Sequence, residues 1–336
     1  MLKAAVQGAG SAGMEHLKAY MRNPHVEIAA IGSRTKEGAR RAAEQLGLDC
    51  PVFDDFEELL KVPGLDLVSI CTPPDRHAAE CVMAAEAGKH VLIEKPVALN
   101  SEELHRMSAA VERAGVKSSV GFVLRWNPLL MTIKKAIAAG MIGRPLLVHA
   151  DYWHGPTNQA PMGVRRRWGP VAGGIMVHGG CHAMDAARFV LGNDPITQVV
   201  GRCPEHERSS PKQRTNVAIV NFACGAVGKI SASNTFHMPY VFNIEVFGDE
   251  GVIRNNRFYF KRFTGQLDVG EFPTVLPDSG EVAHHPFGGL IDDLVDCILN
   301  GVESTNSLKV AVNTHEACFA AERSAANQGE PIQLLA

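Results

Sequence analysis

The chain has 336 residues, of which 46% are hydrophobic, 21% charged and 6% aromatic, and its formal net charge is -3 at pH 7. This length is sufficient for two domains with large cores, and the composition is that of a globular protein. The small negative charge excludes a general nucleic-acid binder, since the one basic cluster, residues 165–167, is short. The apolar runs are too short to cross a bilayer. We therefore expect neither a nucleic acid nor a membrane as partner.

The cysteines and the first residues point to a reducing compartment. The eight cysteines are scattered and contain no Cys-x-x-Cys pair. This usage is typical of reduced thiols rather than of a disulfide framework or a zinc ribbon. Residues 2–6 (Leu-Lys-Ala-Ala-Val) resemble a first strand rather than a signal segment. We expect a cytoplasmic protein.

Up to about residue 122, short Val- and Ile-rich runs alternate with helical patterns. The runs cover residues 4–7, 26–32, 67–72, 90–94 and 118–122. Their uninterrupted apolar character is typical of strands that are buried on both faces. The helical patterns cover residues 12–22, 36–46, 75–87 and 101–114, and the last three are followed by a glycine suited to a C-cap. This alternation predicts an α/β domain with a doubly wound parallel sheet over residues 1–122.

The pattern changes after Trp126-Asn127-Pro128. A helix over residues 128–139 is followed by β-rich sequence, with expected strands at residues 146–154, 196–202, 215–223, 226–235, 241–248 and 258–263. A glycine-rich helical stretch, residues 174–191, interrupts these strands. Two helices close the chain, at residues 287–300 and 307–327. Residues 123–336 are therefore predicted to form an α+β domain with a large, mainly antiparallel sheet.

The first expected strand leads directly into a glycine-rich turn, Gly-Ala-Gly-Ser-Ala-Gly, at residues 8–13. A Gly-x-Gly-x-x-Gly pattern between a strand and a helix is typical of dinucleotide binding. Its first glycine permits the turn, the second lets a pyrophosphate approach, and the third lets the helix pack closely. Exposed N–H groups at the helix start then bind the phosphates. We expect Gly8, Gly10, Ser11 and Ala12 to contact the cofactor; the alternative is a plain glycine turn.

The end of the second strand should meet the adenosine ribose. An NAD site usually has an acidic residue there, which accepts from the 2′-hydroxyl. This chain has Ser33 and Arg34 instead. A hydroxyl and a guanidinium suit a 2′-phosphate, so the sequence favours NADP over NAD. The alternative is that Arg34 lies over the adenine or in solvent.

With these motifs the chain resembles the Gfo/Idh/MocA family, which includes glucose-fructose oxidoreductase and inositol dehydrogenase. The resemblance covers essentially the whole chain. Beyond the glycine turn, its markers are Cys71–Pro74 with His77, Glu94-Lys95-Pro96, Gly121–Pro128, Gly173-Gly174 through His182 to Asp185, and the closing helix ending in Gly329–Pro331. The resemblance implies a Rossmann domain, a second domain with an open-faced sheet, a nicotinamide cofactor, and assembly as a homodimer or homotetramer.

Two of these markers follow strands of the first domain. Thr72 and Pro73 end one strand and Glu94 and Lys95 end the next, at the edge where an open α/β sheet places its ligands. We expect all four, with His77, to contact the cofactor, although His77 suits a helix start equally well. The resemblance implies that Lys95 reaches the reacting oxygen beside the nicotinamide.

Lys95 could act in two ways. Oxidation of an alcohol requires a group that takes the hydroxyl proton while hydride leaves the same carbon. A free lysine has a pKa of about 10.4, so it becomes a base near neutral pH only if burial or a nearby positive charge lowers that pKa. Alternatively, Lys95 stays charged and stabilises the alkoxide, and a histidine takes the proton.

The resemblance makes His182 that histidine. The family usually has an acid four residues earlier, on the same helical face, but this chain has His178 there. An aspartate would draw positive charge onto a neighbouring lysine or histidine, whereas a second imidazole would not. We still assign His178 a catalytic or substrate-binding role. Two histidines at i and i+4 also form half of a metal site. His154 or Asp185 could add a third ligand, but nothing local completes the set, so we expect no metal.

Further site residues are expected around the start of the second domain. The resemblance suggests that His154 contacts the substrate, and the alternative is a histidine at the rim of the cleft. Arg125 and Asn127 lie where the second domain begins, and we expect them to contact the cofactor or the substrate. Asp185 could orient the His182 imidazole or pair with Arg188. The loop over residues 155–168 could be a lid or an oligomer contact.

The function expected from these features is NAD(P)-dependent hydride transfer to or from a secondary alcohol of a sugar, cyclitol or related polyol. One alternative is a glycoside hydrolase or lyase that uses tightly bound NAD transiently, as some relatives do. The other is a non-catalytic dinucleotide-binding protein on the same scaffold.

Overall fold

The structure is a computed structural model that describes residues 1–155, 173–210, 212–274, 277 and 285–335. The chain forms two compact units. The first comprises Met1–Val123 and Glu281–Val312, and the second comprises Leu124–Gly280 and Asn313–Ala336. The sequence pattern predicts a single domain boundary at residue 122. In the structure, a second segment, Glu281–Val312, also belongs to the first unit.

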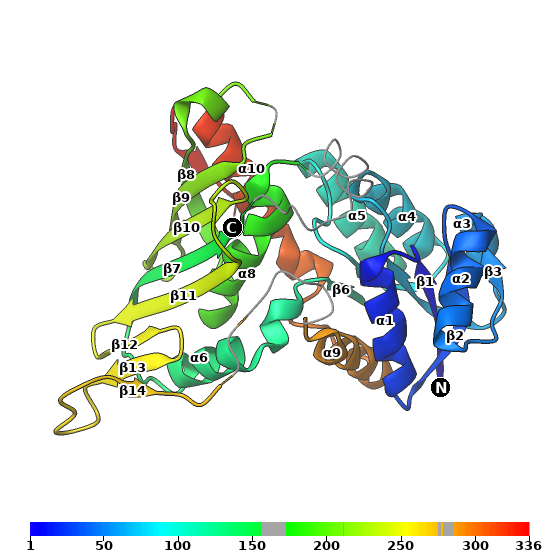
Figure 1. Ribbon diagram of the computed structural model, residues 1–336, viewed down its shortest axis with the longest axis horizontal. Coiled ribbons are helices and arrows are strands. Elements are labelled where there is room, and N and C mark those ends of the chain that lie inside the picture. The colour runs from blue at the N-terminus through cyan, green and yellow to red at the C-terminus, as the bar shows by residue number, and fades with distance from the viewer. Residues whose placement is uncertain (156–172, 211, 275–276, 278–284, 336) are drawn as a thin grey trace. The chain divides into compact units, whose positions relative to one another are not determined.

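The first unit contains a six-stranded parallel sheet in the order β3-β2-β1-β4-β5-β6 (Figure 1). The strands are β1 (Leu2–Gln7), β2 (Val26–Gly32), β3 (Val52–Phe53), β4 (Leu65–Ile70), β5 (His90–Ile93) and β6 (Ser118–Val120). The helices are α1 (Ser11–Arg22), α2 (Lys36–Leu46), α3 (Phe56–Leu60), α4 (Pro74–Glu86), α5 (Ser101–Ala114) and α9 (Phe287–Asn300). The doubly wound parallel sheet is confirmed.

Helix ends in this unit follow the sequence signals. Gly47 and Gly115 are the C-caps of α2 and α5, with φ of 67° and 65°. At the other ends, Thr35 Oγ1 accepts from the Gly38 N–H of α2, and Asn100 Oδ1 accepts from the Glu103 N–H of α5. The elements β3 and α3 were missed, because two and five residues are too short to show a period.

Helix α9 explains why the chain returns to the first unit. Its apolar face packs on α1, and the Phe287 ring lies 5.2 Å from the His16 ring. Asn306, which follows α9, donates through Nδ2 to the Val120 carbonyl and, at 3.1 Å, to Ser119 Oγ. These contacts join residues far apart in the chain and leave no local mark in the sequence.

The second unit contains a nine-stranded sheet in the order β14-β13-β12-β11-β7-β10-β9-β8-β15. Neighbouring strands are antiparallel except for the β10–β7 pair, which confirms the mainly antiparallel α+β prediction. The strands are β7 (Pro145–Trp153), β8 (Ile196–Arg202), β9 (Thr215–Phe222), β10 (Val227–Ser233), β11 (Val241–Gly248), β12 (Gly251–Arg254), β13 (Arg257–Phe260), β14 (Gly270–Glu271) and β15 (Ile332–Gln333).

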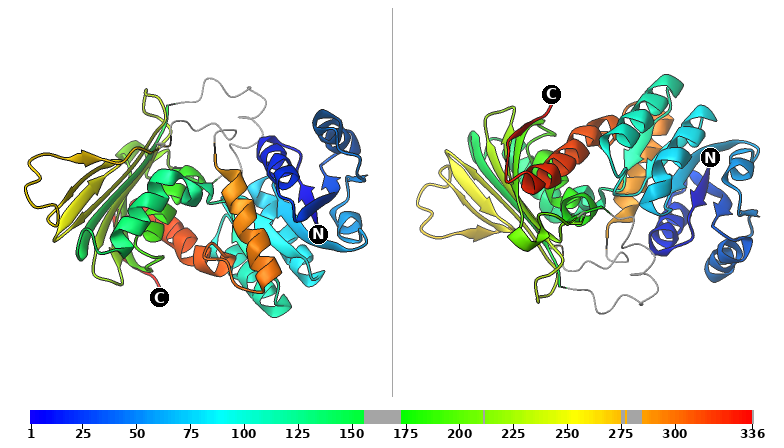
Figure 2. Two further views of the ribbon diagram at one scale, coloured as in Figure 1. Left: turned by 90° about the horizontal axis from the view of Figure 1, so that it is seen from below. Right: turned by 90° about the horizontal axis from the view of Figure 1, so that it is seen from above.

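Helices of the second unit pack on one face of this sheet. They are α6 (Pro128–Ala138), α8 (Cys181–Val190) and the part of α10 (Leu308–Ala326) that belongs to this unit (Figure 2). The other face carries alternate side chains of β9, among which Val217 and Ile219 are 39% and 45% exposed. A π-helical turn, η2 (Met176–Gly180), runs directly into α8. No described helix is long and apolar enough to span a bilayer.

Candidate functional site

The glycine turn lies where the strand order of the first sheet reverses, between β1 and β4. Gly8 has φ of 110°, and a Cβ at this position would lie 2.5 Å from the Cys71 carbonyl oxygen after β4. A Cβ at Gly13 would meet the carbonyl oxygen of Gly8, so α1 packs against the turn only because this residue is glycine. Two glycines are therefore required by the chain's own backbone.

The middle glycine faces open space. A Cβ at Gly10 would have no protein atom within 4 Å, and Gly10 and Ser11 are both exposed. Gly10 is the N-cap of α1 and makes no side-chain cap hydrogen bond, while Ala12 is half-buried in the first turn. Backbone N–H groups at such a helix start bind phosphate oxygens. The turn therefore fits a dinucleotide pyrophosphate.

The end of β2 offers a hydroxyl and a cation. Ser33 is half-buried and its N–H donates to the Phe53 carbonyl at 3.0 Å. Arg34 is exposed. The structure therefore leaves the Arg34 guanidinium accessible at the position where the sequence predicts the ribose.

A buried carboxylate joins the ends of β1 and β4. Glu80 of α4 accepts from Gln7 Nε2 at 3.2 Å and from Thr72 Oγ1 at 2.5 Å, and it pairs with Arg76 at 3.0 Å. Thr72 is 8% exposed, and its hydroxyl is the donor of the hydrogen bond to Glu80. Pro73 is the N-cap residue of α4. Glu80 is not predictable from the sequence pattern, because a glutamate within a helical pattern usually lies in solvent.

Lys95 follows β5 at the same edge of the sheet and is half-buried. Its neighbour Glu94 is 8% exposed and accepts from the Lys95 N–H at 3.1 Å and from His16 Nε2 at 3.0 Å. Burial raises the pKa of Glu94, but the hydrogen bond and charge of His16, together with Lys95, outweigh it and hold that pKa below its ordinary value. Glu94 is therefore an ionised acceptor beside Lys95. A Cβ at Gly121 would lie 3.0 Å from its carboxylate.

His77 does not lie at an exposed helix start. It is 1% exposed, and its two ring nitrogens lie 2.9 Å from the Pro96 carbonyl oxygen and 2.8 Å from that of Thr72. The expected direct contact between His77 and the cofactor stays a prediction, but the observed contacts of its ring atoms are with the backbone of two turns.

In the second unit, the Tyr152 ring contacts the rings of two of the predicted histidines. Its ring stacks on His182 at 5.9 Å between centroids and meets the His154 ring edge-on at 5.7 Å. His182 is 2% exposed, whereas His154 is half-buried. A Cβ at Gly179 would lie 2.5 Å from Tyr152 Cε1, so this glycine lets the helical stretch approach the ring. Tyr152 carries no signal of this contact in the sequence, because aromatic residues are common in strands.

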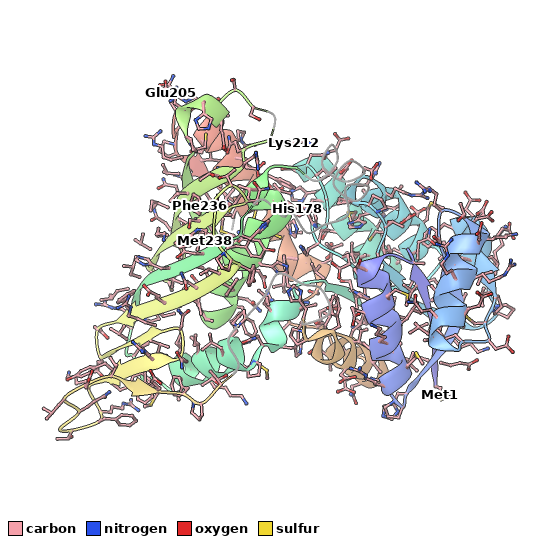
Figure 3. All side chains as sticks on the ribbon, viewed as in Figure 1. Met1, His178, Glu205, Lys212, Phe236 and Met238 are labelled. Carbon is pink, nitrogen blue, oxygen red and sulfur yellow. The ribbon has the colours of Figure 1, made fainter. Side chains whose placement is uncertain are left out.

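His178 lies on the π-helical turn η2 and is half-buried (Figure 3). Its N–H donates to the Gly174 carbonyl at 2.9 Å. A π-turn within a helix is often found at a functional site.

The carboxyl of a half-buried glutamate lies against η2. Glu322 of α10 accepts from the Val177 N–H at 3.1 Å and from the N–H groups of Gly174 and Met176. Burial raises the pKa of Glu322 to about 7, although these three bonds act to lower it. A Cβ at Gly174 would overlap this carboxyl.

Replacing Glu322 with glutamine is expected to flatten the pH dependence of stability. Folding raises this pKa from 4.5 to about 7, so the folded chain keeps a proton that the unfolded chain loses, and the free energy of unfolding falls as pH rises through that window. Each pKa unit corresponds to about 1.4 kcal/mol, so the fall amounts to about 3 kcal/mol at most. Urea unfolding at pH 5 and pH 8 measures it. The exposed Glu58→Gln is the control, and an equal fall in both variants would contradict the assignment.

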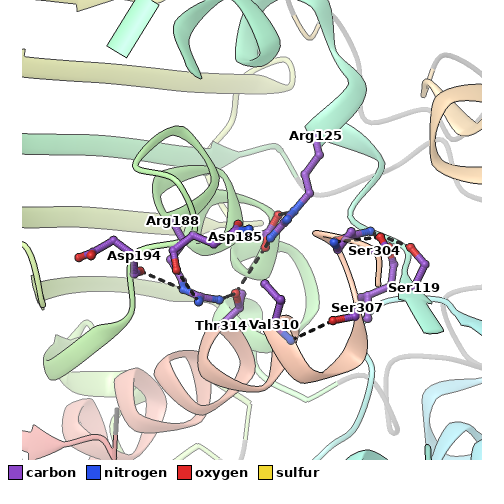
Figure 4. Close-up of polar contacts among 12 residues, drawn as sticks. Ser119, Arg125, Asp185, Arg188, Asp194, Ser304, Ser307, Val310 and Thr314 are labelled. Carbon is purple, nitrogen blue, oxygen red and sulfur yellow. Dashed lines mark hydrogen bonds and ion pairs between the residues drawn. The ribbon is translucent and has the colours of Figure 1, made fainter. Parts of the chain in front are cut away.

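Arg125 and Asp185 form a buried ion pair (Figure 4). Arg125 Nε donates to Asp185 Oδ2 at 2.7 Å and Nη2 donates to Oδ1 at 2.6 Å, and the two residues are 3% and 2% exposed. Asp185 was expected to orient His182 or to pair with Arg188, and in the structure both of its oxygens accept from Arg125. Burial lowers the pKa of Arg188 to about 10, and the charge of Asp185 acts against that shift. Arg188 donates through Nη1 to Thr314 Oγ1 at 2.7 Å. Sixty residues separate Arg125 from Asp185, and no local pattern marks the pair.

The remaining expectations are placed as follows. Asn127 caps α6, where its Oδ1 accepts from the Leu129 N–H at 2.9 Å. Within the described ranges, no group of three or more His, Cys, Asp or Glu side chains could hold a metal ion. All but the first residue of the loop predicted over residues 155–168 lies outside the described residues.

Comparison with known proteins identifies the family. Residues 2–122 match the oxidoreductase family with an NAD-binding Rossmann fold, and residues 130–254 match the GFO/IDH/MocA C-terminal domain. The scyllo-inositol 2-dehydrogenase (NAD(+)) of Bacillus subtilis is 30% identical over 99% of this chain and 96% of its own length. The levoglucosan dehydrogenase of Pseudarthrobacter phenanthrenivorans is 28% identical over 85% of this chain and 82% of its own length.

Solved structures agree on the fold. A levoglucosan dehydrogenase in complex with NADH and levoglucosan superposes with a TM-score of 0.86 at 23% identity, over 99% of both chains. An NAD-binding oxidoreductase from Klebsiella pneumoniae gives a TM-score of 0.85 at 24% identity, over 100% of this chain and 99% of its own. The chain therefore belongs to the GFO/IDH/MocA family of oxidoreductases and has the NAD-binding Rossmann fold of that family.

Proposed function

We propose that this protein is an NAD(P)-dependent dehydrogenase that oxidises a secondary alcohol of a cyclitol, sugar or related polyol, in a reversible reaction. The observation that carries this proposal is the position of Lys95, at the carboxyl end of β5, on the same sheet edge as the glycine turn. The names of the relatives, which act on scyllo-inositol and levoglucosan, support the substrate class.

The proposed roles follow from the chemistry of alcohol oxidation. A nicotinamide bound at the glycine turn would supply the acceptor for the hydride that leaves the carbinol carbon. Lys95 contacts the hydroxyl oxygen, either as a base or as a charge that stabilises the alkoxide. His182 and His178 are proposed to contact the substrate and to move the hydroxyl proton, and His154 and Asn127 to contact the substrate. Gly8, Gly10, Ser11 and Ala12 hold the pyrophosphate, with Thr72, Pro73, His77, Glu94 and Arg125 as the further proposed cofactor contacts.

The experiment that tests this function is a panel of cyclitols, monosaccharides and anhydrosugars, each assayed with NAD and with NADP. Appearance of reduced cofactor at 340 nm, in proportion to substrate consumed, supports a net redox reaction. Dinucleotide binding without turnover of any member, in either direction, would contradict it. Net hydrolysis or elimination with the cofactor unchanged would instead identify a reaction that uses the dinucleotide transiently.

We also propose a preference for NADP over NAD, supported by the exposed Arg34 and the Ser33 hydroxyl at the end of β2. The Bacillus subtilis relative and the solved levoglucosan dehydrogenase complex have NAD(+) or NADH in their names, so the proposed preference is supported by this chain's own residues at the β2 end and not by those relatives. Arg34→Ala is expected to lower kcat/KM for NADP by about 10- to 100-fold, because a hydrogen bond to a charged group contributes about 1.5–3 kcal/mol. The value for NAD should change less than threefold. An equal loss with both cofactors would contradict the preference.

We propose that a second copy of the chain covers the exposed face of the nine-stranded sheet, giving a homodimer or homotetramer. Val217, Ile219 and Val227 on that face are 37–45% exposed, and such apolar exposure on adjacent strands suits a protein interface. Sedimentation velocity measures the assembly, and a monomer at micromolar concentration would contradict it.

A further inference from the structure

The segment Glu94-Lys95-Pro96 is bordered by two buried histidines. His16 comes from α1 and His77 from α4, and their exposed fractions are 0% and 1%. One of them contacts the residue before Lys95 and the other contacts the residue after it. Both helices begin at turns of the dinucleotide-binding edge, after β1 and after β4.

His16 holds the Glu94 side chain. Its Nε2 lies 3.0 Å from Glu94 Oε1, and its Nδ1 lies 3.1 Å from Ser69 Oγ, which in turn lies 2.7 Å from the Tyr20 hydroxyl. An ionised carboxylate can only accept, so Nε2 carries the hydrogen and donates it. The second oxygen of the carboxylate, Oε2, accepts from the Lys95 N–H. His16 therefore acts on the Lys95 backbone through Glu94.

His77 holds the other side of Lys95. Its Nδ1 lies 2.9 Å from the Pro96 carbonyl oxygen and its Nε2 lies 2.8 Å from the Thr72 carbonyl oxygen. Both partners are carbonyl oxygens, which only accept, so a neutral ring donates to one of them and a protonated ring donates to both. The ring therefore joins the turn after β4 to the turn after β5, in a place with no access to solvent.

We propose that His16 and His77 are positioning residues for Lys95. Together they fix the side chain of Glu94 and the carbonyl of Pro96, and so the backbone from which the Lys95 side chain extends. The inference rests on the proposed function, in which Lys95 contacts the reacting hydroxyl. A misplacement of about 1 Å at a reacting centre can cost about 100-fold in rate, so such a device has a measurable effect.

The test uses asparagine and glutamine at both positions. The amide nitrogen of asparagine lies at about the reach of histidine Nδ1, and that of glutamine at about the reach of Nε2. His16→Gln therefore keeps the contact with Glu94 and His16→Asn loses it. At position 77 the pairing is reversed, because His77→Asn keeps the contact with Pro96 and His77→Gln keeps only the contact with Thr72.

We expect kcat to follow these contacts rather than side-chain size. His16→Asn and His77→Gln should lower kcat by about 10- to 100-fold, and His16→Gln and His77→Asn by less than about fivefold. The dissociation constant of the dinucleotide should change less than threefold in the two His16 variants, because His16 is not among the proposed cofactor contacts. If glutamine is the better replacement at both positions, or if the two amides are equal, only volume matters and the proposal is overturned.

A second measurement does not depend on turnover. The Lys95 N–H donates to Glu94 Oε2, so hydrogen exchange at the Lys95 amide should be faster in His16→Asn than in His16→Gln. Equal exchange rates in this pair would overturn the role of His16 even if an altered variant were too unstable to assay. The exchange rates and kcat could follow the expected order while Lys95→Met retains turnover. In that case the proposed function of Lys95 fails and the positioning of its backbone by the histidines does not. The failure of the inference and the failure of the proposed function are therefore distinguishable.

Discussion

Lys95→Met is expected to lower kcat by about 10²- to 10⁴-fold, while the dissociation constant of the dinucleotide changes less than threefold. Both roles open to Lys95, proton acceptor and charge at the alkoxide, require its amine, and each contributes within this range. Methionine keeps the length and apolar volume of the lysine stem, so packing at the half-buried site is conserved. Steady-state assays with the best substrate of the panel, and a fluorescence titration with the cofactor, measure the two quantities.

Two further variants sharpen this result. Lys95→Arg keeps a positive charge but cannot give up its proton near neutral pH, so it retains part of the activity only if Lys95 acts as a charge. Lys61→Met, at a surface lysine paired with Glu58, is the control and should be indistinguishable from the wild type. A kcat for Lys95→Met within threefold of the wild-type value would remove Lys95 from the mechanism.

Asp185→Asn is expected to lower the free energy of unfolding by about 3–5 kcal/mol. The change leaves the Arg125 guanidinium, which is 3% exposed, without the carboxylate that accepts two of its hydrogen bonds. Breaking a buried ion pair by removing one partner costs this much because the remaining charge is still buried. Chemical denaturation followed by tryptophan fluorescence and circular dichroism measures the loss.

The control for this prediction is a surface pair of the same kind. Glu245→Gln breaks the pair with Arg254, whose side chain is 64% exposed, and should cost less than about 1 kcal/mol. A loss of unfolding free energy in Asp185→Asn no larger than in this control would contradict the prediction. It would mean that the Arg125–Asp185 pair contributes little to stability, and it would favour a direct contact of Arg125 with the cofactor.

The sequence predicts those parts of the fold that depend on neighbouring residues. Gly8, Gly10 and Gly13 lie within six consecutive residues, and the contact that requires Gly13, with the carbonyl oxygen of Gly8, lies within the same turn. Lys95 could be placed at the sheet edge because a strand pattern ends directly before it. The proposed preference for NADP could also be derived from the sequence, because it depends on two adjacent residues, Ser33 and Arg34.

Parts that depend on distant residues could not be predicted. His77 has the pattern of a helix start, and its contact with Pro96 exists only because β4 and β5 are neighbours. Asp185 could be paired with Arg188 on helical spacing, but its observed partner, Arg125, comes from another element. Glu322 has the pattern of an acidic residue on a helix surface, and only the structure shows that its carboxylate accepts from the backbone of η2. In each case the side chain has the correct type, and only the tertiary structure supplies the partner.

Helix α9 also sets the order of events during synthesis. Its first residue, Phe287, packs on α1, yet it leaves the ribosome long after the last strand of the first sheet, β6, which ends at Val120. Translation proceeds at about 5–20 residues per second, so roughly 10–30 s pass between the synthesis of β6 and that of α9, the helix that packs on α1. During that interval the apolar side of α1 is uncovered, and a chaperone has time to bind it. The nucleotide-binding unit therefore cannot be complete until its second segment, which ends at Val312, has been translated.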